Sequence, residues 1–255
     1  MEAGRARVLG VSDTPSFLVV VPTIRQEWEE FDPTIARIRE SFSMPTEFHI
    51  LDGSAGKPAA LNAAHDALLR PSQATYYVTL DDDIVPIRGW QQVMHQAMQD
   101  FPELGAASLY YGDSAELQQL MGAERLNPPL TRGVSTVRTC KPGHHLAGGN
   151  ITFRRDMALK VGPMPLQGHR YVLWEDAWRG RRVVAAGGAL AYVLGAAVEM
   201  IEFKEPEHYR QEKVEGIALS RQTQREMLDA TGVRDPLTIR LRRKIAKWRG
   251  RGDGF

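Results

Sequence analysis

Apolar and polar positions along the first 111 residues alternate between short hydrophobic runs and longer amphipathic stretches. The short runs are rich in β-branched and aromatic residues and are bounded by turn residues, which is typical of buried strands. They occupy 17–21, 47–51, 76–80 and 105–111. The stretches at 33–41, 58–69 and 90–101 have helical composition or spacing. This alternation predicts an α/β fold with a mostly parallel, doubly wound sheet flanked by helices.

The pattern changes after Gly112. Residues 112–146 have several Pro and Gly positions and predict a long irregular segment with a short helix at 115–121. Such a segment inside a compact domain is often a lid or a binding loop. Strands are expected at 147–154, 189–194 and 196–201, a helix at 175–186, and a mostly helical C-terminal part.

These changes predict a domain organisation. We expect a flexible leader at 1–15, one globular domain at 16–204 and a helical C-terminal extension at 205–255. The break at Gly112 divides the domain into halves, 16–111 and 112–204, which we expect to share one core.

Composition narrows the class of protein. The chain has 255 residues, 43% hydrophobic and 25% charged, which is ordinary for a soluble globular protein. A net charge of +1 provides no general attraction for nucleic acid. The single cysteine, Cys140, excludes an intramolecular disulfide and a cysteine-based zinc cluster. Without a signal peptide or an apolar stretch of about 20 residues, the chain is expected to be soluble and cytoplasmic.

Three consecutive aspartates, Asp81, Asp82 and Asp83, directly follow the strand predicted at 76–80. Ligands of open α/β sheets bind at such strand ends. Carboxylates packed together repel one another, and a divalent cation such as Mg²⁺ or Mn²⁺ removes that cost and can bridge to phosphates. The alternative is a solvated turn with a helix cap. Because side chains alternate in extended chain, Asp82 is expected to point away from its neighbours.

Two further polar positions follow the second predicted strand. Asp52 lies in an Asp-Gly-Ser sequence, which is compatible with a plain turn or with a hydrogen bond to a nucleobase or ribose. Lys57 precedes a helix with Pro58 in its first turn, and this arrangement suits either an anion site or an exposed lysine.

Acidic and basic residues near the C-terminal half add candidates. Glu175 and Asp176 begin a predicted helix, where they either complement the helix dipole or supply a general base. His208 is either a metal ligand or a lone surface histidine. Segment 236–251 combines an apolar stripe with many Arg and Lys residues; packing onto the domain is the commoner outcome, and peripheral contact with an anionic membrane is the alternative.

Six short motifs occur in a characteristic order. They are VVVPT at 19–23, LDGS at 51–54, GKPAALN at 56–62, LDDDI at 80–84, GGNITFRR at 148–155 and WED at 174–176. Together they cover roughly residues 17–200, and in this order the chain resembles a GT-A glycosyltransferase of the family 2 type.

The resemblance implies a nucleotide-diphosphate-sugar donor and a Mn²⁺ or Mg²⁺ ion. Asp81 and Asp83 would correspond to the metal-binding DXD motif, and Asp176, with Glu175 beside it, to the acidic base. The half at 16–111 would bind nucleotide, and the half at 112–204 the acceptor. The residues expected to bind the donor are Pro22, Thr23, Arg25, Asp52, Lys57, Asp81, Asp82 and Gly149.

The sequence departs from the family in two respects. The histidine that often completes the metal site after the last strand is missing, so His208 or Glu199 is expected to substitute, or phosphate and water complete the shell. The Gln-x-x-Arg-Trp signature of processive polysaccharide synthases is also missing. Transfer of a single sugar, with a UDP-sugar favoured as donor, is therefore expected.

Three functions remain, two of them enzymatic and the third a binding role. The first is the glycosyltransferase, acting on a small-molecule, glycan or lipid-linked acceptor. The second is a nucleotidyltransferase that makes nucleotide-sugars, although segment 22–26 lacks the glycine-rich loop such an enzyme needs. The third is a catalytically silent nucleotide-sugar-binding scaffold, against which the Glu175-Asp176 pair argues. Homodimer formation stays open.

Overall fold

A computed structural model of the chain describes residues 14–111, 125–166 and 174–229, with side chains described up to residue 219. The predicted helix at 115–121, the basic segment at 236–251 and nearly all of the predicted leader lie outside these ranges. The domain boundaries and the membrane contact therefore stay predictions. No helix within the described ranges is apolar over a length sufficient to cross a bilayer.

Strands and helices alternate through most of the chain. The strands are β1 (Phe17–Thr23), β2 (Thr46–Asp52), β3 (Tyr76–Leu80), β4 (Ile84–Pro86), β5 (Leu104–Tyr110), β6 (Leu130–Arg132), β7 (Ser135–Thr139), β8 (Asn150–Arg154) and β9 (Ala189–Met200). The helices are α1 (Phe31–Glu40), α2 (Lys57–Ala64) with its π-helical continuation η1 (His65–Leu69), α3 (Trp90–Asp100), α5 (Arg155–Val161), α6 (Glu175–Ala185) and α7 (Glu207–Asp229).

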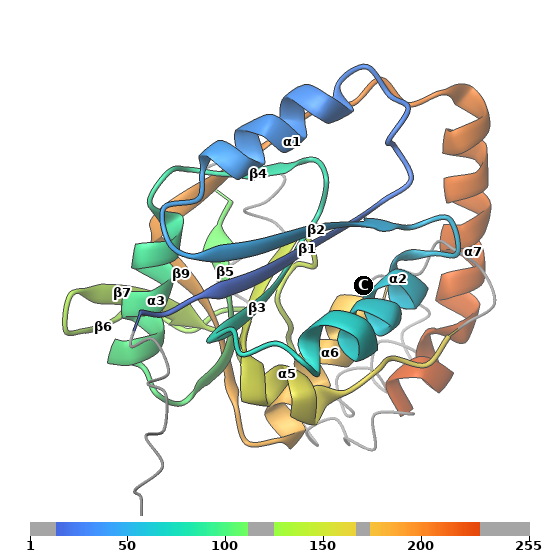
Figure 1. Cartoon of the computed structure of the whole chain (residues 1–255). Helices are drawn as coiled ribbons and strands as arrows, with labels where there is room; N and C mark the ends of the chain where they lie inside the picture. The colour runs from blue at the N-terminus through green and yellow to red at the C-terminus, as the bar shows by residue number, and fades with distance from the viewer. Residues whose placement is uncertain (1–13, 112–124, 167–173, 230–255) are drawn as a thin grey trace, which may run out of the picture.

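The strands form one sheet in the order β2-β1-β3-β8-β5-β9-β7-β6, and β4 pairs with β9. Pairs β1–β2, β1–β3 and β5–β9 are parallel, whereas β8 runs antiparallel between β3 and β5. Most strands still point in the same direction, so the predicted α/β class with a mostly parallel sheet is confirmed. Figure 1 shows α1 on one side of the sheet, with α2, α5 and α6 on the other.

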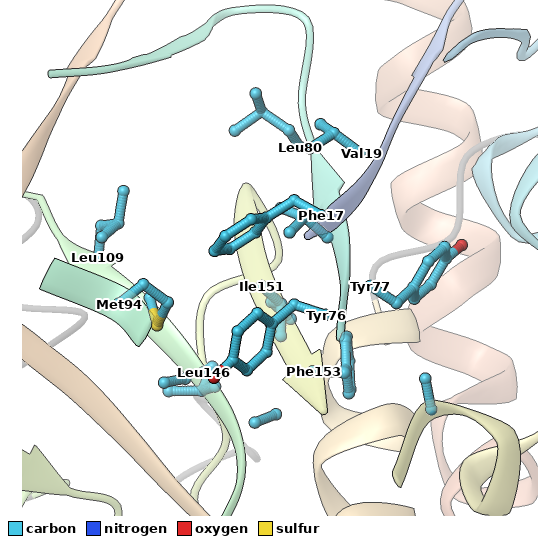
Figure 2. Close-up of a cluster of buried hydrophobic side chains, with 14 of the residues drawn as sticks. Phe17, Val19, Tyr76, Tyr77, Leu80, Met94, Leu109, Leu146, Ile151 and Phe153 are labelled. Atoms are coloured by element: carbon cyan, nitrogen blue, oxygen red, sulfur yellow. The ribbon is translucent and has the colours of Figure 1, made fainter. Parts of the chain in front are cut away.

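One face of the sheet is covered through aromatic packing. The Phe17 ring of β1 lies 5.0 Å from the Tyr76 ring of β3 and 5.5 Å from the Trp90 ring at the start of α3. The Tyr76 hydroxyl lies 2.8 Å from Nδ1 of His95, also on α3. Figure 2 shows Phe17 and Tyr76 within this cluster, together with Met94. Alternation along β3 therefore places its odd and even residues in different hydrophobic layers.

The opposite face begins with the next residue of β3. Tyr77 pairs with Phe153 of β8, and both line a cavity of about 20 Å³ together with Leu61 of α2 and Val161 of α5. Helix α6 contributes Arg179, whose guanidinium lies 4.3 Å from the Phe153 ring centre. Helices α2, α5 and α6 thus share one side of the sheet.

Two regions differ from the sequence prediction. The segment expected to be irregular contains the β6–β7 hairpin, and β7 pairs with β9 at the edge of the sheet. The two strands expected at 189–194 and 196–201 form the single strand β9. Its register against β5 shifts between Val193 and Ala197, so the intervening residues bulge. Gly195 lies in this bulge, where a Cβ would come within 2.9 Å of Cγ1 of Val93 on α3, so the close approach favours glycine.

The aromatic packing predicts where the fold is most sensitive. Phe17→Ala should lower the free energy of unfolding by about 3–5 kcal/mol, because it leaves a cavity between Tyr76 and Trp90. Urea denaturation followed by circular dichroism measures this change. Leu130→Ala is the control, since Leu130 is 48% exposed on the edge strand and should change stability by less than about 0.5 kcal/mol. Equal effects of the two substitutions would contradict the assignment of the core.

Candidate active site

The ends of three parallel strands meet at one edge of the sheet. Thr23, the last residue of β1, lies opposite Asp52, the last residue of β2, and Asp81 follows directly after β3. The Asp81 backbone N–H donates to the carbonyl of Gly149 at 2.8 Å, so the start of β8 lies at the same edge. A Cβ at Gly149 would come within 2.8 Å of the Tyr111 hydroxyl, which explains the need for glycine at this close approach.

Asp82 is the buried member of the aspartate run. Its carboxylate accepts hydrogen bonds from the Thr23 hydroxyl and from Nη1 of Arg25, the latter at 2.8 Å. Burial raises the pKa of Asp82 to about 6, although Arg25 and Thr23 both favour the ionised form. With its oxygens engaged inside the protein, Asp82 ties the loop after β1 to the loop after β3.

Arg25 joins this cluster to the C-terminal part of the domain. Its guanidinium lies 4.7 Å from the Phe203 ring centre and 6.0 Å from that of Tyr209 in α7. The same Nη1 that binds Asp82 also lies 3.1 Å from Oδ2 of Asp83. Burial opposes the charged form of Arg25, but the two carboxylates raise its pKa overall. Asp82 and Asp83 thus converge on one cation, so Asp82 does not simply point away from both neighbours.

Lys57 connects Asp81 to the helix that begins at Glu175. Its Nζ lies 2.6 Å from Oδ1 of Asp81 and 3.2 Å from Oε1 of Glu175. It also donates to the carbonyl oxygen of Gly148 at 3.4 Å. Burial disfavours the ammonium, but Asp81 and Glu175 together raise the pKa of Lys57. The first residue of α2 therefore joins the end of β3, the start of α6 and the segment before β8.

Asp176 lies beside Glu175 in a different environment. Burial raises its pKa to about 6, and Oδ1 accepts the backbone N–H of Ala177 at 2.6 Å. Oδ2 lies 3.6 Å from Nε2 of His145. Burial lowers the pKa of His145 to about 4, so this imidazole is neutral at pH 7. Glu175, whose pKa burial also raises, has Lys57 as a direct partner.

Sequence reasoning did not assign Gly148 or His145 to the site. A Cβ at Gly148 would lie 3.3 Å from Cβ of Asp176, 3.4 Å from Oε1 of Glu175 and 3.5 Å from Nζ of Lys57. The position therefore packs against all three candidate residues. The Gly-Gly-Asn sequence was a usable signal for Gly148, whereas nothing in the chain predicts that His145 faces Asp176.

Other predicted site residues lie at the rim. Asp52 is exposed and forms a local turn, accepting the Ser54 backbone N–H at 2.9 Å and the Ser54 hydroxyl at 3.0 Å. The Ser54 hydrogen bonds lower the pKa of Asp52. Pro22 is half-buried in β1, opposite Leu51. These positions flank the strand ends and leave Asp52 accessible.

The chemistry of the aspartates fits a hard cation. The Asp81 and Asp83 side chains are 33% and 29% exposed, and burial followed by the charge of Asp81 raises the pKa of Asp83. A divalent ion would relieve this repulsion with oxygen ligands. Within the described ranges, however, no three His, Cys, Asp or Glu side chains are grouped so as to hold an ion. His208, exposed at the start of α7, is not brought into such a group with the aspartates.

Comparison with known proteins establishes the fold. No family model and no curated protein sequence matches the chain. The mannosyltransferase PcManGT from Pyrobaculum calidifontis, in complex with GDP-Man and Mn²⁺, has a TM-score of 0.53 and 15% identity over 88% of this chain and 67% of that one. GalNAc-T7 with UDP, GalNAc and Mn²⁺ has a TM-score of 0.50 and 11% identity over 82% of this chain and 48% of that one. The chain has the GT-A fold, as predicted.

The buried cluster predicts a stability role for Asp82. Asp82→Ala should lower the free energy of unfolding by about 3 kcal/mol, because the buried Arg25 loses its closest carboxylate. Chemical denaturation measures the loss. Asp156→Ala is the matched control, since its pair with Lys160 at 3.7 Å is on the surface and should contribute little. A loss no larger than that of the control would refute the structural role of Asp82.

Proposed function

We propose that the chain is a metal-dependent glycosyltransferase that moves one sugar from a nucleotide-diphosphate-sugar to an acceptor hydroxyl. The observation that carries this proposal is the bridge made by Lys57, which brings Asp81 at the end of β3 together with Glu175 at the start of α6. A polar strand-end site on a GT-A fold thus contains both an acidic run suited to a cation and a separate carboxylate suited to proton transfer. The fold neighbours in complex with nucleotides and Mn²⁺ support the same class.

The donor is proposed to bind along the strand ends. Lys57 and Arg25 are the cations nearest the aspartates and would interact with the diphosphate, while exposed Asp52 would contact the base or ribose. Thr23 and Asp82 would act by holding the loops, with Pro22 and Gly149 shaping the backbone. A UDP-sugar is the favoured donor, although one neighbour was determined with GDP-Man and the other with UDP.

Asp81 and Asp83 would hold the Mn²⁺ or Mg²⁺ ion, with their partly exposed carboxylates facing the donor side. When bound, such an ion supplies Lewis-acid stabilisation of the charge that develops on the leaving diphosphate. A further protein ligand, which the sequence suggested could be His208 or Glu199, stays a prediction.

Asp176 is the proposed general base. Its carboxylate would accept the proton of the acceptor hydroxyl as that oxygen attacks the anomeric carbon, with inversion of configuration. Glu175 is less suited to the task because its carboxylate is paired with Lys57 at 3.2 Å. The imidazole of His145, neutral at pH 7, faces Asp176 without supplying a positive charge that would weaken the base.

The base assignment predicts a pH profile. Asp176 acts when ionised, so kcat/KM should fall about tenfold per pH unit below the pKa of about 6. Asp176→Asn should reduce transfer by about 10²–10⁴-fold and remove this acidic limb, while nucleotide binding persists. Steady-state kinetics and calorimetry measure the two effects. Wild-type turnover in Asp176→Asn would refute the assignment, and NMR of the product anomer tests inversion.

The donor site predicts a metal-dependent thermal shift. UDP-, GDP- and dTDP-sugars are screened with and without Mn²⁺, and a true donor should raise the melting temperature only with the ion. Asp83→Asn should abolish this shift but keep the unliganded melting temperature within a few degrees. Glu103→Gln, on the exposed pair with Arg132, is the control. An unchanged Mn²⁺-dependent thermal shift in Asp83→Asn would contradict the metal-binding role of Asp83. A thermal shift in the wild type without sugar transfer would favour the catalytically silent scaffold.

A further inference from the structure

The ammonium of Lys57 is surrounded by oxygen atoms in the manner of a bound cation. Its three neighbours are a carboxylate oxygen of Asp81 at 2.6 Å, a carboxylate oxygen of Glu175 at 3.2 Å and the Gly148 carbonyl at 3.4 Å. An ammonium has three donors, so these oxygens can engage all of them. The Lys57 side chain is 22% exposed, which limits competition from water.

The second aspartate proposed to bind metal is also paired. Asp83 interacts with Arg25 at 3.1 Å, and Arg25 is held in turn by Asp82 at 2.8 Å. Each proposed metal ligand therefore has its own protein cation. The structure pairs Asp81 and Asp83 with these two cations rather than with a common partner.

The charges favour an exchange when donor and metal bind together. A divalent ion alone adds two positive charges beside Lys57, and a diphosphate alone adds negative charge beside the carboxylates. When the ion and the diphosphate bind together, their opposite charges nearly cancel. The ammonium can then pair with phosphate oxygen while Asp81 is released for the ion, so neither the ammonium nor the Asp81 carboxylate is left without an opposite charge.

We infer that Lys57 is a tethered counter-ion that competes with the divalent cation for Asp81 until the donor diphosphate draws its ammonium away. This inference rests on the proposed function and adds to it a regulation of the same site. Lys57 is a positioning residue in the unliganded protein and a diphosphate ligand in the loaded one. The consequence is that Mn²⁺ alone binds weakly, and that nucleotide and metal strengthen each other's binding reciprocally.

Lys57→Gln tests the competition directly, through Mn²⁺ binding without any nucleotide. Removing the ammonium should tighten the Kd for Mn²⁺ alone by about tenfold or more, since no positive charge beside Asp81 then repels the ion or competes with it for the carboxylate. The same variant should bind nucleoside diphosphate more weakly and show a smaller increase in Mn²⁺ affinity when UDP or GDP is added. Calorimetry or electron paramagnetic resonance of free Mn²⁺ measures these constants.

Two further variants separate charge from packing. Lys57→Arg keeps a cation beside Asp81, so its Kd for Mn²⁺ alone should stay within about threefold of wild type. Lys160→Gln removes one positive charge from an exposed pair on α5 and should leave Mn²⁺ binding unchanged. Circular dichroism melts confirm that each variant is folded.

The outcomes distinguish this inference from the proposed function. Unchanged or weaker binding of Mn²⁺ alone by folded Lys57→Gln overturns the competition, while metal-dependent nucleotide binding by the wild type would leave the proposed function standing. Absence of Mn²⁺ binding in wild type and variant alike, with every nucleotide diphosphate tried, overturns both. Equal tightening in Lys57→Gln and Lys57→Arg also overturns the inference, because it would show that packing rather than charge controls access.

Discussion

The concentration of carboxylates at the ends of parallel strands is the constraint on which this site depends. Three aspartates follow β3, and Glu175 and Asp176 begin the nearby helix α6. Like charges at such short range destabilise a fold unless cations lie between them. Lys57 and Arg25 fill that role; Lys57 is the first residue of α2, and Arg25 lies in the loop after β1. The same ion pairs that neutralise the site therefore also join β1, α2, β3 and α6.

The local pattern of apolar and polar residues was sufficient to predict many of the strands and helices. The apolar run at 76–80 matches β3, and the amphipathic stretch at 90–101 matches α3 closely. The antiparallel position of β8 between β3 and β5 was not predicted. The residues at 150–154 do not themselves show which strands they pair with, because those strands lie far away in the sequence. The β6–β7 hairpin was missed for a related reason: β6 is exposed and short, so it lacks the apolar signature of a buried strand.

The candidate site was predictable at the level of residue type but not of partnership. The order of the motifs predicted Asp81, Lys57 and Glu175 as candidate site residues, and the structure brings these three side chains together. Strand alternation suggested that Asp82 points away from its neighbours, yet the chain turns immediately after Leu80, and Arg25 draws Asp82 and Asp83 to the same guanidinium. Side chains alternate in direction along a strand, and this alternation no longer predicts their direction where the strand ends.

The position of the proposed base depends on a contact that lies away from the site. Arg179, one turn after Asp176 on α6, is buried and donates to the Thr79 hydroxyl of β3 at 3.0 Å. Thr79 precedes Asp81 by two residues, so this hydrogen bond couples the register of α6 to the strand that carries the aspartates. Burial lowers the pKa of Arg179, and its ring contacts with Phe153 and Tyr77 partly compensate for desolvation. Two contacts near the start of α6 therefore set the distance between the proposed base and the proposed donor site. Lys57 pairs with Glu175, the first residue of the helix, and Arg179, one turn later, donates to Thr79.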